Sequence, residues 1–420
     1  MRRLVAPLLI ATLLLGSRTA RTASAEPLAE KYLLEGRLAE GEKALLAALE
    51  RAPKDSRARF GLGATQFLRV IERMAQSFHR HGLRDVGGGM VPFLRLPVPA
   101  NPDPKPLRYE DLRSIFAAWV ADVSRAEATL AQVDDPDVKL PLHFGLIWLD
   151  LDGDGKAGED ETLWKIYARF NRQAGRPGSD DRVSGAKAKD FVIAFDRGDV
   201  AWLRGYCHLL RALAEVYLAH DSRELFDHAA HLVFARPETP FDFLRSRGER
   251  VPRDFDYNEI VDLIATIHAI RLPISEPKRM GSALEHLEAM IALSRESWRF
   301  YEAEADDDNE WIPNPEQETV LPGVRVTDEM VKGWKEFLGE AEGLLAGKVL
   351  APFWRDPGGS RGINLRRVFT EPKGLDLVLW VQGTAAMPYL EEGSITKPEV
   401  WQRLQRVFGG EFIGFALWFN

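Results

Sequence analysis

Apolar residues recur every three or four positions along most of the chain, which is the period of an amphipathic helix. From Tyr109 to about Val133 the large apolar residues fall on one helical face: Leu112, Ile115, Phe116, Trp119, Val120 and Val123. The same period predicts helices within 27–80 and over about 161–172, 199–219, 222–234, 256–270, 278–305, 328–346 and 397–408. Because the alternation typical of strands is rare, we predict a mainly α, multi-helix assembly.

Breaks in this pattern divide the chain into segments. They are an N-terminal leader at 1–25, a helical hairpin at 26–81, a Gly/Pro-rich linker at 82–108, a segment with an acidic loop at 109–190, a helical region at 191–305 and an aromatic-rich helical region at 306–420. The linker contains the triplet Gly87-Gly88-Gly89 and several prolines, which interrupt helices. The chain ends on Phe415, Trp418 and Phe419, so we expect its C-terminus to dock on the core.

The first 25 residues have the three parts of a secretory signal peptide. Arg2 and Arg3 supply positive charge, Leu4–Leu15 form the apolar run, and 23–25 are the small residues before a cleavage site near Glu26. This run is shorter than the ~20 apolar residues that cross a bilayer, so cleavage is favoured over a retained anchor. We therefore predict an exported protein, periplasmic or secreted, with no stable membrane anchor after cleavage.

Charge limits the partners of the mature chain. The full chain has 55 basic and 63 acidic residues, and the leader contributes four arginines and no acid. Cleavage therefore leaves 51 basic against 63 acidic residues, a net charge of −12 in place of −8. A surface this negative disfavours nucleic acid and anionic lipid and suits cations. The single cysteine, Cys207, excludes an intramolecular disulfide, and its apolar surroundings predict a buried thiol.

One acidic segment, 150–161, has the composition of a cation-binding loop. Carboxylates stand at its positions 1, 3, 5 and 12, and Gly155 stands at position 6, where the chain must turn sharply. This spacing resembles the EF-hand calcium loop, over residues 150–161 only. The resemblance implies five ligands to Ca²⁺: Asp150, Asp152 and Asp154 through one carboxylate oxygen each, Lys156 through its backbone carbonyl, and Glu161 through both carboxylate oxygens.

Two features of the loop favour a structural ion over a calcium sensor. Ala157 stands where paired loops usually carry a branched apolar residue, and the loop has no second copy in the chain. The incoming segment 140–149 contains Pro141 and Gly145, so we expect it to be extended and not helical. Position 9 is Gly158, which leaves its ligand place to water.

The hairpin region contains a candidate repeat. Leu28-Ala29 returns as Leu62-Gly63 after 34 residues, and between the two pairs stand Tyr32, Gly36, Gly41, Leu45, Ala48 and Pro53. This pattern resembles a tetratricopeptide repeat over 26–72, with small residues where the two helices touch. Because solenoids need about three repeats, a lone hairpin packed on the body is favoured over a peptide-binding groove. A protein partner bound to this hairpin remains an alternative function.

Other polar groups offer weaker hypotheses. The histidines His208, His220, His228, His231 and His268 could build a metal or acid–base site, and the 354–367 loop could bind an anion or a sugar through its arginines and Trp354. Structural roles are favoured for both. The acidic run 306–310 is interpreted as a solvated helix terminus, with a second cation site as the alternative.

Our leading hypothesis is an exported protein that holds Ca²⁺ structurally and has no evident catalytic machinery. The alternatives are an interaction scaffold that uses the 26–72 hairpin, and a hydrolase or sugar-binding protein. The latter would use the 354–367 loop or the helix face from His220 to His231.

Overall fold

Helices make up most of the part of the chain that the structure describes. The computed structural model describes residues 26–84, 97–156, 158, 160–166, 185–241, 243–244, 257–320, 325–408 and 412–419. The leader, the glycine triplet and most of the polar loop at 173–188 lie outside these residues. The helices are α1 (Leu28–Leu34), α2 (Leu38–Arg51), α3 (Ser56–Arg80), α4 (Tyr109–Leu130), α6 (Gly185–Asp190), α7 (Arg197–Ala219), α8 (Arg223–Val233), α9 (Tyr257–Ala269), α10 (Pro277–Tyr301), α11 (Asp328–Leu345), α12 (Leu365–Thr370), α13 (Leu377–Gln382), α14 (Pro398–Val407) and α15 (Phe412–Phe419). The mainly α prediction is confirmed.

Polar side chains mark where several of these helices begin. Asp55 accepts a hydrogen bond from the backbone N–H of Ala58 at the start of α3, and Thr327 accepts one from Met330 at the start of α11. Asp196 and Asp199 form a reciprocal capping box at the start of α7. Such side chains satisfy N–H groups that have no partner within the helix, and they fix the first residue of each helix.

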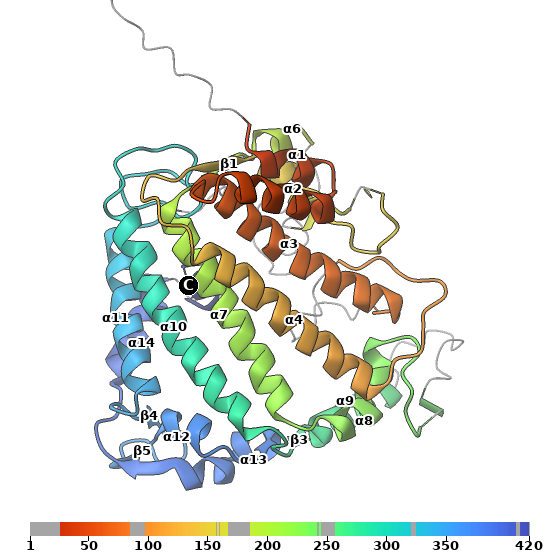
Figure 1. Ribbon diagram of the computed structural model, residues 1–420. Coiled ribbons are helices and arrows are strands. Elements are labelled where there is room, and N and C mark those ends of the chain that lie inside the picture. Colours follow the sequence, from red (N-terminus) through yellow and green to blue (C-terminus); the bar gives the residue numbers. More distant parts are fainter. Residues whose placement is uncertain are drawn as a thin grey trace, which may run out of the picture.

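The long helices lie side by side in chain order (Figure 1). Helix α3 packs on α4, α4 on α7, α7 on α10, and α10 on α11, while α1 and α2 cover α3. One hydrophobic core joins α1 to α8, and a second lies among α10, α11, α14 and α15. Phe419 is buried in the second core against Trp298 and Trp334, which confirms that the C-terminus is docked.

Short strands connect the helices. Among the described residues they form three small antiparallel sheets: β1 (Leu140–Leu142) with β2 (Ile193–Phe195), β3 (Arg271–Leu272) with β6 (Leu375–Asp376), and β5 (Arg361–Ile363) between β4 (Ala351–Pro352) and β7 (Leu390–Glu392). In the first sheet Leu140 faces Phe195 and Leu142 faces Ile193. This pairing holds the chain that leads into the 150–161 loop.

Small residues bring the N-terminal helices into close contact. A β-carbon on Gly41 would lie 2.7 Å from the Tyr32 Cβ, and one on Gly61 would lie 2.9 Å from the Ala29 Cβ. Helix α3 is 25 residues long and packs along α4. The hairpin is thus built into the body of the protein, and its membership of a repeat family stays a prediction.

Two further observations concern the burial of Cys207 and the length and polarity of the helices. Cys207 is fully buried in α7, as predicted, and burial raises the pKa of its thiol. Within the described ranges, every helix is too short or too polar to cross a membrane.

Candidate calcium site

Carboxylates shape the 150–156 turn by accepting hydrogen bonds from its backbone. Asp150 accepts from the N–H of Gly153 at 2.7 Å through Oδ1 and from that of Gly155 at 3.2 Å through Oδ2. Asp152 accepts from Asp154 at 3.0 Å, and Asp154 accepts from Lys156 at 2.7 Å. Gly153 and Gly155 have φ of +80° and +73°, which few residues other than glycine adopt.

This turn brings three carboxylates together. Oxygen atoms of Asp150, Asp152 and Asp154 all lie within 4.8 Å of one another. Two oxygens on opposite sides of a calcium ion are about 4.8 Å apart, because each lies about 2.4 Å from the ion. The three side chains can therefore share one ion after small rotations. Burial, with the charges of Asp152 and Asp154, raises the pKa of Asp150, and a bound cation would offset both effects.

Glu161 lies at the base of the loop and not in the three-carboxylate group. Its side chain is only 4% exposed, and burial raises its pKa. Its Oε1 accepts from the N–H of Leu151 at 2.8 Å and its Oε2 from the N–H of Gly158 at 2.7 Å. Ligation of Ca²⁺ by both oxygens would exchange these hydrogen bonds for the ion. Lys156, whose backbone carbonyl is the expected ligand, is exposed at the end of the turn, and its N–H donates to Asp154.

Extended backbone leads into the loop. After β1 and a single 3-10 turn at Phe144–Leu146, the N–H of Leu149 donates to the carbonyl of Glu161 at 3.0 Å, and that of Leu163 donates to Ile147 at 2.9 Å. A short antiparallel bridge therefore closes the loop. The segment 140–149 contains no α-helix, as predicted, whereas the bridge was not predicted. The exit helix is described over 163–166, and the rest of its predicted length lies outside the described residues.

Helix α3 anchors the loop through two residues that the sequence pattern did not single out. Gln76 Nε2 donates to the carbonyl of Asp150 at 2.8 Å, and the N–H of Asp150 donates to Glu72 Oε1 at 3.1 Å. Glu72 is 7% exposed, and burial, with the nearby charge of Asp150, raises its pKa to about 7. In the sequence Glu72 and Gln76 stand four positions apart among other polar residues of α3, such as Arg69 and Arg73, so nothing there marks them as contacts of the loop.

A second acidic group lies between α7 and the loop after α10. Oxygens of Asp196, Glu304 and Glu310 also lie within 4.8 Å of one another. The interpretation of 306–310 as solvated is wrong for Glu310, which is 3% exposed, although Asp306 and Asp307 are exposed. Burial and the proximity of Asp196 raise the pKa of Glu304 to about 9 and that of Glu310 to about 7. Protons on Glu304 and Glu310 can therefore reduce the negative charge of this group without a bound ion.

The histidines have separate partners. His220 Nδ1 lies 2.7 Å from the Val216 carbonyl, His231 Nε2 lies 3.2 Å from Asp262 Oδ2, and His228 stacks on Phe241. His208 contacts His286 between α7 and α10, with the two Nδ1 atoms 3.1 Å apart. Two cavities formed by described residues, of about 330 Å³ between α3 and α4 and about 530 Å³ between α11 and α14, contain none of these histidines. The hydrogen bonds and ring contacts favour structural roles for these histidines, and the hydrolase alternative stays a hypothesis.

Most arginines of the 354–367 loop form ion pairs or hydrogen bonds with other residues of the protein. Arg367 pairs with Glu371 at 2.7 Å and with Glu391 at 3.0 Å, and Arg366 pairs with Glu288 at 2.9 Å. Arg361 donates to the Leu390 carbonyl at 3.0 Å. These contacts connect strands and helices, so they favour the structural interpretation of this loop over an anion or sugar site.

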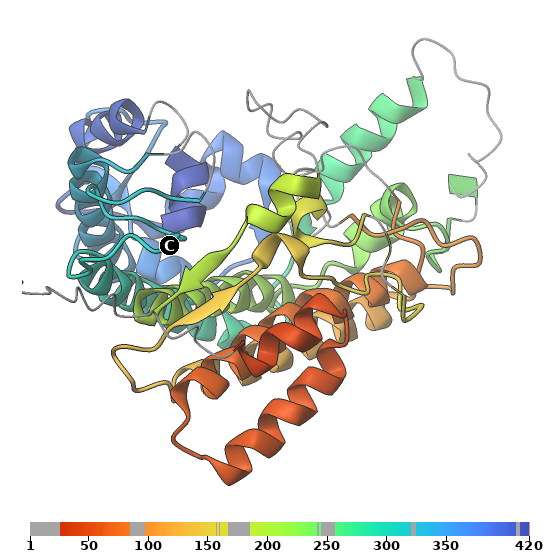
Figure 2. The same ribbon diagram turned by 90° about the horizontal axis from the view of Figure 1, so that it is seen from above.

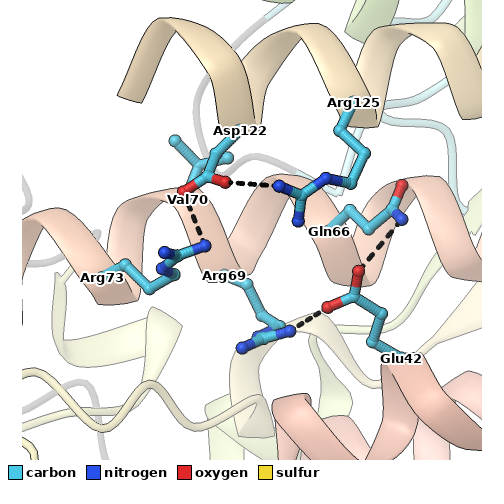
Figure 3. A pocket seen from close by; sticks show the side chains of 7 residues that line it. All are labelled: Glu42, Gln66, Arg69, Val70, Arg73, Asp122 and Arg125. Atoms are coloured by element: carbon cyan, nitrogen blue, oxygen red, sulfur yellow. Dashed lines mark hydrogen bonds and ion pairs between the residues drawn. The ribbon is translucent and has the colours of Figure 1, made fainter. Parts of the chain in front are cut away.

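Charged side chains fill the space between the N-terminal hairpin and α4 (Figure 3). Asp122 pairs with Arg73 at 2.8 Å and with Arg125 at 3.0 Å, while Glu42 pairs with Arg69. Only about 10 Å³ remains there, which is room for one water molecule. The ion pairs join α2, α3 and α4 and leave no place for a peptide at this point.

No protein-family model, curated protein or solved structure matches this chain.

Proposed function

We propose that this chain is an exported calcium-binding protein in which one Ca²⁺ ion, held by the 150–161 loop, fixes the loop against α3. The observation that carries the proposal is the convergence of the Asp150, Asp152 and Asp154 carboxylates on a turn with two left-handed glycines. Hard divalent cations prefer such oxygen clusters, and the flexible coordination of Ca²⁺ tolerates the irregular spacing of a loop. Export rests on the leader at 1–25.

The surroundings of the loop favour a structural ion. The loop closes on a short backbone bridge, and α3 holds Asp150 through Glu72 and Gln76. A sensor needs two helices that can change their angle, whereas extended backbone enters this loop. Single extracellular calcium modules bind with dissociation constants on the order of 10⁻⁴–10⁻³ M, and we expect this range here.

Calorimetric titration of the mature chain, 26–420, with calcium chloride tests the proposal. We expect one ion per chain and at least a tenfold loss of affinity in Asp150→Ala and in Glu161→Ala. Asp135→Ala is the matched control, because Asp135 is exposed and accepts a similar hydrogen bond, from the N–H of Asp137, outside the loop. No binding at millimolar calcium, or equal loss in all three variants, would refute the site.

A further inference from the structure

Helix α9 presents an apolar stripe to solvent. Its residues Ile260, Val261, Leu263, Ile264 and Ile267 are between 38% and 61% exposed. They stand at intervals of one, three, four and seven, so they share one face of the helix. Figure 2 shows α9 projecting from the layer of long helices. In a folded protein such a stripe normally packs on another element.

A second group of exposed apolar residues lies on α13, next to the C-terminal end of α9. Strand β3, directly after α9, pairs with β6, directly before α13, and the N–H of Leu377 donates to the Ile270 carbonyl at 3.0 Å. On α13, Val378 and Leu379 are about half exposed and Val381 is 70% exposed. We call these eight residues the α9–α13 patch: Ile260, Val261, Leu263, Ile264, Ile267, Val378, Leu379 and Val381.

The eight residues of this patch carry no charge, although the chain is strongly acidic and Glu259 directly precedes Ile260. Within α9, Asp262 is turned toward His231, which lies 3.2 Å away, and its side chain is only 11% exposed. Without residues 1–25 the chain has 51 basic and 63 acidic residues, a net charge of −12, so two copies repel each other overall. The repulsion is least where two patches meet.

We propose that the α9–α13 patch is the interface of a homodimer, with a second copy of this chain as its occupant. The eight side chains expose roughly 700 Å² per copy, close to the ~800 Å² that each partner contributes to a standard interface. A helical stripe of this width packs on an identical stripe, and a two-fold axis then buries both copies at once. The partner surface must be as apolar and as poor in charge as this patch. The same patch on a second copy has both properties.

Sedimentation velocity of the mature chain over a roughly hundredfold range of concentration tests the dimer. We expect a reversible dimer, and at least a tenfold weaker one in Ile264→Glu and in Val381→Glu, which place charges on the two halves of the patch. Leu46→Glu is the matched control, because Leu46 is 45% exposed on α2, away from the patch. Circular dichroism checks that all three variants keep the helical content and melting temperature of the wild type.

A cysteine on the stripe gives a second readout. Cys207 is the single cysteine of the sequence and is buried, so a new exposed cysteine is the accessible thiol of each chain. We expect Ile264→Cys to form a disulfide-linked dimer on mild oxidation with copper phenanthroline, and Leu46→Cys to form far less. A monomer at all concentrations, or a dimer that both glutamates leave intact, overturns the proposal. So does a monomer whose patch binds lipid vesicles or a different protein, because the occupant is then not a second copy.

Discussion

At the scale of single residues, Glu310 links stability to pH. Its carboxyl group is 3% exposed, and burial next to Asp196 raises its pKa from 4.5 to about 7. Between these two values the folded chain keeps a proton that the unfolded chain has released. The contribution of protonated Glu310 to the free energy of unfolding is therefore fully present below about pH 4.5. It is lost as the pH rises through about 7.

Replacement of Glu310 by glutamine removes this dependence. Without added metal and with a chelator present, we expect Glu310→Gln to be more stable than the wild type at pH 8, by on the order of 1–3 kcal/mol, and similar at pH 4.5. Urea unfolding at several pH values measures the difference. Glu316→Gln, in the same loop but less buried, should follow the wild-type curve. If the free energies of unfolding of the wild type and Glu310→Gln change with pH in parallel, Glu310 is not the source of the pH dependence.

The residues of the candidate site differ in how far the sequence could predict them. Asp150, Asp152 and Asp154 follow from spacing alone, because a loop of twelve residues builds the group locally. Glu72 and Gln76 contact Asp150 across more than seventy positions, and a helical period does not say which distant loop meets which turn. The burial of Glu310 was missed because a run of acids is usually solvated. Its buried position depends on contact with the distant Asp196, which the sequence does not show.

At the scale of elements, two glycines should respond oppositely to alanine. At Gly41 the new β-carbon would lie 2.7 Å from the Tyr32 Cβ, so α1 and α2 must separate. Overpacking of this kind costs about 1–3 kcal/mol, more than the ~1 kcal/mol that alanine contributes as a better helix former. We expect Gly41→Ala to lower the free energy of unfolding by about 1 kcal/mol, measured by urea denaturation.

Gly281 in α10 is the control for that experiment. A β-carbon on Gly281 would meet no atom within 4 Å outside its own stretch of helix, so alanine adds helix propensity without a clash. We expect Gly281→Ala to raise the free energy of unfolding by up to about 1 kcal/mol. If both variants shift the urea midpoint in the same direction, the close contact between α1 and α2 does not control stability.

Helices were predictable and strands were not, for reasons of length. The helix expected over 199–219 is observed at Arg197–Ala219, and that over 328–346 at Asp328–Leu345, because several turns of apolar periodicity precede each end. The strands are two or three residues long, too short for alternation to show. They exist through pairing with distant partners, as Arg271 does with Asp376. Only the tertiary structure supplies that information.

At the scale of the whole molecule, calcium should stabilise the fold. A ligand that binds only the folded chain stabilises it by RT ln(1 + [L]/Kd), about 1.4 kcal/mol at ten times Kd and about 2.7 kcal/mol at a hundred times. The loop is held to α3 through Asp150, and α3 packs on α2 and α4, so ordering of the loop supports the N-terminal core. We expect millimolar calcium to raise the melting temperature by a few degrees.

Matched variants and a second metal make this expectation specific. The rise should disappear in Glu161→Ala and Asp150→Ala and persist in Asp135→Ala, measured by differential scanning calorimetry. Magnesium should produce a smaller rise, because it demands octahedral geometry and gives up its water reluctantly, whereas this irregular loop suits a larger ion. A melting temperature that stays constant while titration calorimetry detects binding would mean that the ion does not favour the folded loop. That result would contradict a structural role and leave calcium as a ligand without influence on the fold.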